Sequence, residues 1–156
     1  IFVARQLQKH EYMPWNEISR RYVDSEPEFY QPDTWRGRSS DKKQGSEGEV
    51  DMVDINGRFP LPPGTVQTLS DGKTLEAYRN LIDAGVAPEQ ARMVLPQSMM
   101  TEWYWSGSLY AFAKMCGLRL KPDTQYETRL VAEQIEDKMT ELFPESWTAL
   151  RTYDDS

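Results

Sequence analysis

The chain has 156 residues and carries a net charge of −7 at pH 7. This acidic balance argues against a nucleic-acid polymer as the main partner, because proteins that grip a phosphate backbone present a basic face. It leaves open a mononucleotide, whose phosphate needs only about two or three well-placed arginines. The length predicts a single domain, residues 1–156, and a hydrophobic content of 38% gives it a modest core.

Cysteine content and hydropathy indicate the cellular setting. The single cysteine, Cys116, excludes an intrachain disulfide and favours a reducing, cytoplasmic location. No apolar run approaches the length of a membrane span, so we expect no membrane partner. The chain starts at Ile1, inside an apolar stripe that no helix cap precedes. We interpret this as a domain whose N-terminal portion is missing from the sequence.

The first half of the chain predicts one helix and short extended segments. Val3 and Leu7, four positions apart, predict a helix over residues 1–11 that ends before Pro14. Two further segments are predicted to be extended, residues 17–23 and residues 28–32. Residues 36–50 are polar and contain glycine, so they predict a long loop, which in a compact domain is usually functional or mobile.

Apolar residues at helical spacing then predict helices to the end of the chain. These helices cover residues 69–85, 87–96, 100–117, 121–144 and 145–153. Gly85 and Gly117 suit the position just after a helix C-cap. The sequence therefore predicts an α+β fold, with a small, mainly antiparallel sheet flanked by helices and a helix-rich C-terminal half.

Three consecutive aromatic residues, Trp103, Tyr104 and Trp105, lie in one of the predicted helices. Such a cluster usually belongs to a core. Neighbouring positions of a helix point in different directions, however, so the three rings cannot all face one core. Part of their surface must therefore contact another subunit, a ligand or solvent.

Residue counts exclude most familiar catalytic arrangements. One histidine and one cysteine cannot build the usual zinc site, so we expect no metal. A nucleophilic pair of Cys116 and His10 requires a fold that brings them together, and a packed core cysteine is the alternative that we favour. The sequence contains neither GxGxxG nor GxxxxGK[ST], so neither a dinucleotide fold nor a P-loop is indicated.

Arginines at predicted element boundaries are the remaining candidates for binding. Arg21, Arg92 and Arg119 each offer a planar fork that can grip a phosphate or the edge of a pyrimidine by two parallel hydrogen bonds. Alternatively each pairs with a surface carboxylate, since the chain has 25 acidic residues. His10 is either a structural histidine or a catalytic base.

The segment "RQLQKHEYMPWNEISRRYV" resembles the signature of flavin-dependent thymidylate synthases, roughly R-H-R, two residues, S, one residue, N-E, one residue, S, one residue, R-Y. Lys9-His10-Glu11 stands at R-H-R and Pro14 at the first serine. The matching positions are Asn16, Glu17, Ser19, Arg21 and Tyr22. Three further blocks agree in order: "EFYQPDTWR", "KQGSEGE" and "ARMVLPQSMMTEWYWSGSLYAF…GLRLKPDTQYETR". The resemblance covers almost the whole chain and marks a divergent member.

The resemblance implies the thymidylate synthase-complementing protein fold and the reductive methylation of dUMP to dTMP. Methylenetetrahydrofolate supplies the carbon, FAD relays the hydride and NADPH reduces the flavin, so the enzyme is an FAD-dependent methyltransferase. In this family no side chain attacks the uracil, which suits a chain without an activated nucleophile. The resemblance also implies a homotetramer whose active sites lie between subunits.

The resemblance assigns the site residues position by position. A first set falls on dUMP-binding positions: Gln6, Lys9, Glu17, Ser19, Arg21, Arg92 and Arg119. Arg119 matches the arginine that polarises the pyrimidine at N3, and is the expected catalytic residue. A second set falls on flavin-contacting positions: Lys9, His10, Glu11, Glu17, Ser108, Leu109, Tyr110 and Lys114. Two arginines common in the family are replaced here by Glu11 and Tyr110.

These departures on the flavin side leave two alternatives to the synthase. One keeps dUMP and FAD but makes a hydroxymethylated pyrimidine nucleotide. The other is a relative that binds dUMP without flavin and has no synthase activity.

Overall fold

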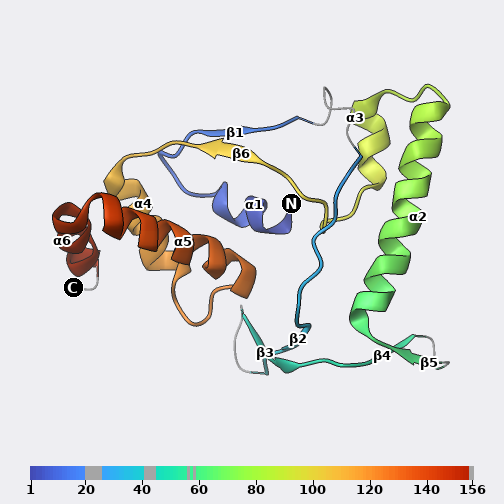
Figure 1. Ribbon diagram of the computed structural model, residues 1–156, viewed down its shortest axis with the longest axis horizontal. Coiled ribbons are helices and arrows are strands. Elements are labelled where there is room, and N and C mark those ends of the chain that lie inside the picture. Colours follow the sequence, from blue (N-terminus) through green and yellow to red (C-terminus); the bar gives the residue numbers. More distant parts are fainter. Residues whose placement is uncertain (20–25, 41–44, 56, 58, 155–156) are drawn as a thin grey trace. The chain divides into compact units, whose positions relative to one another are not determined.

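The computed structural model describes residues 1–19, 26–40, 45–55, 57 and 59–154 (Figure 1). Among these residues the chain forms six α-helices, one 3-10 helix and six short strands. The strands form three two-stranded sheets, β1 with β6, β2 with β3 and β4 with β5. The predicted α+β class, with small antiparallel sheets and a helix-rich C-terminal half, is confirmed. None of the helices formed by the described residues is both long and apolar enough to cross a membrane.

The chain divides into two compact units, which we describe separately. The first comprises Ile1–Phe2, Glu17–Gly37 and Glu49–Glu102. The second comprises Val3–Asn16, Arg38–Gly48 and Trp103–Ser156. The expected single domain stays a prediction.

The first unit is organised around one long helix, α2. It also contains the antiparallel pair β4–β5, in which Val53 faces Leu61 and Ile55 faces Phe59. The bounds of its elements are β4 Val53–Ile55, β5 Phe59–Leu61, α2 Pro63–Asp83, α3 Pro88–Ala91 and the 3-10 helix Arg92–Val94. Proline begins both α2 and α3, because its fixed φ suits the first helical turn and its missing N–H is not needed there.

Helix α2 ends where the glycine pattern predicts. Gly85 has a φ of 80°, and its N–H donates to the Ile82 carbonyl at 2.9 Å. The Val86 N–H donates to the Leu81 carbonyl, also at 2.9 Å. This pair of bonds is the Schellman arrangement, which satisfies the last carbonyls of a helix and favours glycine because of its left-handed backbone.

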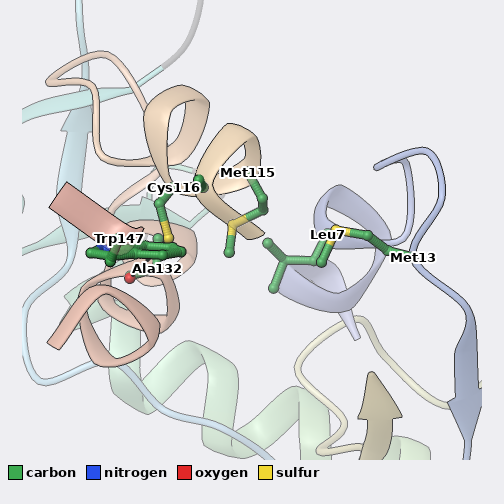
Figure 2. Close-up of a cluster of buried hydrophobic side chains, with 7 residues drawn as sticks. Leu7, Met13, Met115, Cys116, Ala132 and Trp147 are labelled. Atoms are coloured by element: carbon green, nitrogen blue, oxygen red, sulfur yellow. Dashed lines mark hydrogen bonds between the residues drawn. The ribbon is translucent and has the colours of Figure 1, made fainter. Parts of the chain in front are cut away.

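The second unit is mostly helical. Its elements are α1 Phe2–Leu7, β1 Trp15–Glu17, β3 Ser46–Glu49, β6 Trp103–Trp105, α4 Leu109–Arg119, α5 Tyr126–Leu142 and α6 Pro144–Asp154. One end residue of each of α1, β1 and β3 falls in the first unit. Helices α4, α5 and α6 pack against one another. Figure 2 shows their shared core, where Cys116 of α4, Ala132 of α5 and Trp147 of α6 meet. Cys116 and Ala132 are fully buried and Trp147 is 2% exposed, so burial of these apolar side chains stabilises the unit.

Two predictions near the N-terminus need correction. The predicted helix over residues 1–11 ends earlier, at Leu7. The predicted strand over residues 17–23 is shifted, because β1 is Trp15–Glu17 and ends where that strand was expected to begin. The aromatic Trp15 favours the strand more strongly than the serine and arginine residues that follow. Residues 20–23 of the predicted strand lie outside the described residues.

The predicted loop over residues 36–50 is wrong at both ends. Strand β2, Arg36–Arg38, pairs with β3, and only four positions between the two strands lie outside the described residues. Composition suggested a loop because the segment is polar. Every residue of β3 is exposed, so the strand has no apolar face that composition could reveal. The backbone hydrogen bonds between β2 and β3 define the ribbon instead.

The predicted helix over residues 100–117 is wrong at both ends as well. Trp103–Trp105 forms β6, and α4 begins only at Leu109, where Ser108 supplies the N-cap. Consecutive large aromatic residues favour a strand over a helix. At the other end α4 runs through Gly117 and includes Arg119 as its last residue, because packing against α5 and α6 offsets the low helix propensity of one glycine.

Candidate functional site

A hydrogen-bonded arginine lies at the C-terminal end of α4, in the second unit. The Nε of Arg119 donates to Nε2 of His10 at 3.0 Å. Its Nη2 donates to the backbone carbonyl of Gln6 at 2.9 Å. Both acceptors come from α1 and the turn after it, so the structure brings together three residues that the sequence analysis singled out. The two bonds fix the plane of the guanidinium and leave its Nη1 edge without a partner among the described residues.

The charge states of this pair follow from their surroundings. Partial burial, followed by the nearby Arg119 cation, lowers the pKa of His10 below its usual 6.5. Burial also lowers the pKa of Arg119, which remains a cation at neutral pH. His10 is therefore neutral at pH 7, and the lone pair of its Nε2 accepts a hydrogen bond from the Nε–H of Arg119. The pair therefore carries a single positive charge, that of Arg119, because the neutral His10 adds none.

Two residues that the sequence analysis did not single out hold the side chain of Gln6. Its Nε2 donates to Oε1 of Gln125, the residue before α5. Its Oε1 accepts from Oγ1 of Thr128, a fully buried residue of α5, at 3.3 Å. Both lie in "DTQYETR", the end of the last quoted block. Their position in this block is the feature of the sequence that could have marked them as site candidates. Gln6 is thus fixed by its side chain while its carbonyl holds Arg119.

The start of α4 carries the expected flavin-contacting residues. Ser108 is the N-cap, and its side chain accepts from the Ala111 N–H at 3.1 Å. Leu109 packs against the buried core. Tyr110 is 50% exposed, and Nζ of Lys114 lies 5.6 Å from the centre of its ring. The first turn of α4 has no acidic residue, so a positive helix end, a lysine and an exposed aromatic ring gather here.

The turn after α1 carries the residues at the R-H-R positions. Lys9 and Glu11 are exposed on either side of His10. Tyr12, which the sequence analysis did not single out, has a φ of 58° and is 88% exposed. A non-glycine residue in the left-handed region is uncommon, and such backbone conformations concentrate at functional sites.

In the first unit, the structure places Glu17 against a threonine. Oγ1 of Thr101 donates to Oε1 of Glu17 at 2.5 Å. The Ile18 N–H donates to the Glu102 carbonyl at 2.9 Å, which fixes the two backbones beside this contact. Thr101 lies in the same quoted block as Arg92, and the sequence analysis gave it no role. This contact makes Thr101 one of the residues that hold the Glu17 side chain.

The other predicted dUMP contacts of the first unit are less constrained. Arg92 is exposed in the 3-10 helix that follows α3, and no carboxylate among the described residues pairs with it. Ser19 is half-buried. Arg21 lies outside the described residues, so its expected role stays a prediction.

Cys116 is a core residue, as the favoured interpretation predicted. Its thiol donates to the Ala132 carbonyl at 3.7 Å inside the helical core. Burial first, and then the Glu136 carboxylate, raises the pKa of the thiol to about 12. The neutral thiol is a poor nucleophile, so a catalytic pair with His10 is not supported. Within the described ranges, no group of three or more His, Cys, Asp and Glu side chains could hold a metal ion.

Residues 1–145 match the protein family described as thymidylate synthase complementing protein. The chain belongs to this family. It is 39% identical over 153 residues to a flavin-dependent thymidylate synthase of Thermus thermophilus, covering 98% of this chain and 54% of the relative. It is 38% identical over 133 residues to one of Kosmotoga olearia, covering 85% of this chain and 55% of the relative. The chain spans about half the length of these curated relatives.

Solved structures support the same assignment. A crystal structure of the UMP/dUMP methylase PolB from Streptomyces cacaoi bound with 5-Br dUMP has a TM-score of 0.79 and 28% identity, covering 97% of this chain and 67% of that chain. A second structure of PolB, bound with 5-Br UMP, also has a TM-score of 0.79, with 27% identity, covering 99% of this chain and 70% of that chain. The thymidylate synthase-complementing protein fold is confirmed.

The residues expected to bind the nucleotide and those expected to bind the flavin differ in how they are held. Three of the residues expected on the nucleotide side are held by hydrogen bonds: Gln6 and Arg119 in the second unit and Glu17 in the first. On the expected flavin side, Glu11 and Tyr110 are exposed and keep no arginine-like charge. Lys9 and Lys114 are the cations that remain there.

Proposed function

We propose that the protein is a flavin-dependent thymidylate synthase, and that this chain supplies much of its dUMP-binding surface. The reaction is the reductive methylation of dUMP to dTMP with methylenetetrahydrofolate and NADPH. The observation that carries the proposal is the fixed guanidinium of Arg119, held by His10 and by the Gln6 carbonyl. A cation fixed at the edge of a pyrimidine ring suits a nucleotide methylase, because it stabilises the negative charge that builds up on the ring.

Arg119 acts on the ring through its free edge. Its Nη1 side can donate to the N3–O edge of a uracil ring while Nε and Nη2 stay bonded to the protein. A fixed cation at that edge favours negative charge building up there, which makes the ring carbon a better nucleophile. His10 serves as the neutral acceptor that orients the arginine, so the cation's charge is directed at the substrate.

Other residues anchor the nucleotide. Arg92 is an exposed guanidinium without a carboxylate partner among the described residues, which suits it to a phosphate. Glu17, oriented by Thr101, offers a carboxylate acceptor for substrate N–H or O–H groups. Ser19, Lys9 and Arg21 complete the proposed contacts.

The residues at the start of α4 fit an FAD cofactor. Ser108 caps a helix end whose dipole favours an anionic group, and Lys114 adds a cation one turn later. The exposed Tyr110 ring offers a surface for stacking, and Lys9 and His10 lie on the turn after α1. When bound, the flavin supplies the hydride that reduces the transferred carbon. Glu11 is exposed, so its charge can turn towards solvent.

A second candidate is a methylase that accepts UMP as well as dUMP. It is favoured by the fold similarity to PolB, a UMP/dUMP methylase whose structures hold 5-Br dUMP and 5-Br UMP. We also propose a homotetramer with active sites between subunits. Exposed aromatic residues such as Phe59, 77% exposed, are suited to such interfaces.

The proposal is tested on the full-length protein. Its absorption spectrum should show bound or reconstitutable flavin, and it should convert dUMP to dTMP with NADPH and methylenetetrahydrofolate. Parallel assays with UMP decide between the two candidates, and mass analysis of the product distinguishes a methyl from a hydroxymethyl group. A protein that binds dUMP but cannot be reconstituted with FAD would contradict the synthase and support the flavin-free alternative.

A further inference from the structure

A buried carboxylate lies in the middle of α2, in the first unit. Asp71 is 6% exposed. Its Oδ1 accepts from Oγ of Ser98 at 3.0 Å, and its Oδ2 accepts from Nε2 of Gln67 at 3.0 Å. Aspartate is a weak helix former and is almost never fully buried without partners. Helix formation and packing alone therefore do not explain this residue, since an apolar side chain would serve both better.

The bonds of Asp71 belong to a closed ring that joins three segments. Nε2 of Gln67 also donates to the Tyr30 carbonyl at 2.6 Å. The Tyr30 N–H donates to the Ser98 carbonyl at 2.8 Å. The Ser98 hydroxyl closes the ring by donating to Oδ1 of Asp71. The ring thus links α2 to the segment around Tyr30 and to the segment that follows the 3-10 helix. A bridge between Phe29 and Met99 holds the last two segments together.

The segment held by Asp71 leads directly to the proposed nucleotide site. Thr101 follows Ser98 by three residues, and its Oγ1 donates to Oε1 of Glu17 at 2.5 Å. The Met100 N–H, between them, donates to the Glu28 carbonyl at 2.7 Å. The backbone from Ser98 to Thr101 is therefore fixed at both ends, and Asp71 supplies the buried anchor.

We propose that Asp71 is a positioning residue for nucleotide binding, which holds the Ser98–Thr101 segment so that Thr101 orients the Glu17 carboxylate. This rests on the proposed function, in which Glu17 contacts dUMP. In this proposal Asp71 acts through Thr101 and Glu17 and does not contact the nucleotide. A carboxylate already held in its binding geometry loses less side-chain freedom when the nucleotide binds, so the ring raises affinity through preorganisation.

A double-mutant cycle in the full-length protein tests the proposal, with dUMP affinity measured by calorimetry. The variants are Asp71→Ala, Thr101→Val and the two combined. Each single change should weaken dUMP binding about tenfold, equivalent to about 1.4 kcal/mol. The combined variant should be weakened by about the same factor, because both changes release the same carboxylate. A combined loss of about a hundredfold, the product of two independent effects, overturns the proposal.

Matched variants separate positioning from general damage to α2. Thr74→Val removes a hydroxyl that donates to the Asp71 backbone carbonyl, in the same helix but outside the ring, and should leave dUMP affinity unchanged. Asp71→Asn keeps the shape and two polar groups, and the Ser98 hydroxyl can donate or accept, so it should retain affinity within about threefold of the wild type. A loss with Asn equal to that with Ala overturns the role of the ring.

Three further outcomes are decisive. If Asp71→Ala does not fold, Ser98→Ala replaces it in the cycle with the same expected coupling to Thr101, and additivity there overturns the proposal. A wild-type protein that binds no dUMP overturns the proposed function and this inference with it. A wild type that binds dUMP, with an Asp71→Ala variant of equal affinity, overturns the inference alone.

Discussion

Arg119 and His10 are 109 positions apart in the sequence, yet their side chains form one hydrogen-bonded pair. The sequence analysis named both residues as site candidates through the family resemblance. It could not predict their contact, because no local pattern encodes a pairing between a turn after one helix and the end of another. Of the two interpretations of His10, this contact favours the structural one, because Nε2 of His10 accepts a hydrogen bond from Nε of Arg119.

The stability of the protein should fall as His10 becomes protonated. The folded-state pKa of His10 is lowered, so the unfolded chain takes up a proton at higher pH than the folded protein does. The contribution of His10 to stability is complete above the unfolded value, about 6.5. It is lost as pH falls below that value towards the folded pKa. Melting temperatures at pH 7.5 and pH 5.5, conditions chosen at about one unit on either side of that value, measure the loss.

The matched control for this effect is His10→Gln. Glutamine can accept from Nε of Arg119 through its amide oxygen but does not titrate. This variant should lose less stability between the two pH values than the wild type does. An equal loss in both proteins would show that other groups, and not His10, cause the pH dependence.

Cys116 gives a second prediction at the residue scale. Its raised pKa, about 12, and its complete burial keep the thiol protonated and covered. At pH 8 a thiol reagent should label the native protein more slowly than a denatured sample by about two orders of magnitude or more, because labelling requires unfolding. Absorbance of the released thiol product measures both rates. Equal rates in native and denatured protein would mean that α4 does not bury Cys116 against α5 and α6.

At the scale of elements, β6 shows how an aromatic run can be misread. Hydrophobic periodicity cannot separate a short strand from a helix when three large residues are consecutive. In the strand, the side chains alternate. Trp103 stacks on Trp15 with ring centres 4.3 Å apart, Trp105 packs edge-on against Phe112 at 5.4 Å, and Tyr104 points away and is 74% exposed. The expectation that one ring must leave the core is confirmed, although the reason is strand alternation.

Substitutions along β6 should follow this alternation. Trp105→Ala removes ring contacts with Trp15, Phe112 and His10, and should lower the free energy of unfolding by about 3 kcal/mol. Tyr104→Ala, the matched control, should change it by about 0.5 kcal/mol or less. Chemical denaturation of both variants measures the difference. Similar losses in the two variants would contradict the alternation of the strand, in which the Tyr104 side chain points away from the core.

Elements with a clear period or a capping signal were predicted well. Helix α5 was expected from its apolar stripe, and the end of α2 from Gly85. The pair β2–β3 was missed because it has no apolar face to mark it, and the Gly117 signal was overridden by tertiary packing. Local sequence predicts a helix or strand correctly when the side chains of that element determine its structure. The prediction fails when backbone pairing with another strand, or packing against a neighbouring helix, determines the structure instead.

At the scale of the whole molecule, the chain supplies residues of two kinds to the proposed reaction. Arg119 is partly buried and fixed by two bonds, whereas Arg92 is exposed and has no carboxylate partner among the described residues. The sequence motifs identified both arginines but could not distinguish a rigid guanidinium from an adaptable one, because that difference depends on contacts made across the fold. Rigidity suits the polarisation of a ring, and exposure suits the capture of a phosphate.

This difference predicts separate effects on catalysis and on binding. Arg119→Ala should abolish turnover more than it weakens dUMP binding, because the fixed cation acts mainly as charge builds up on the ring. Arg92→Ala should raise the dissociation constant of dUMP, costing about 2 kcal/mol of binding free energy, while turnover at saturating dUMP is retained. Arg79→Ala is the matched control, since Arg79 is an exposed arginine of the same unit that pairs with Glu26. Steady-state kinetics with calorimetry on the full-length protein separates the two effects. Equal losses of dUMP affinity in the Arg119 and Arg92 variants, with proportional losses of turnover, would refute the division of roles.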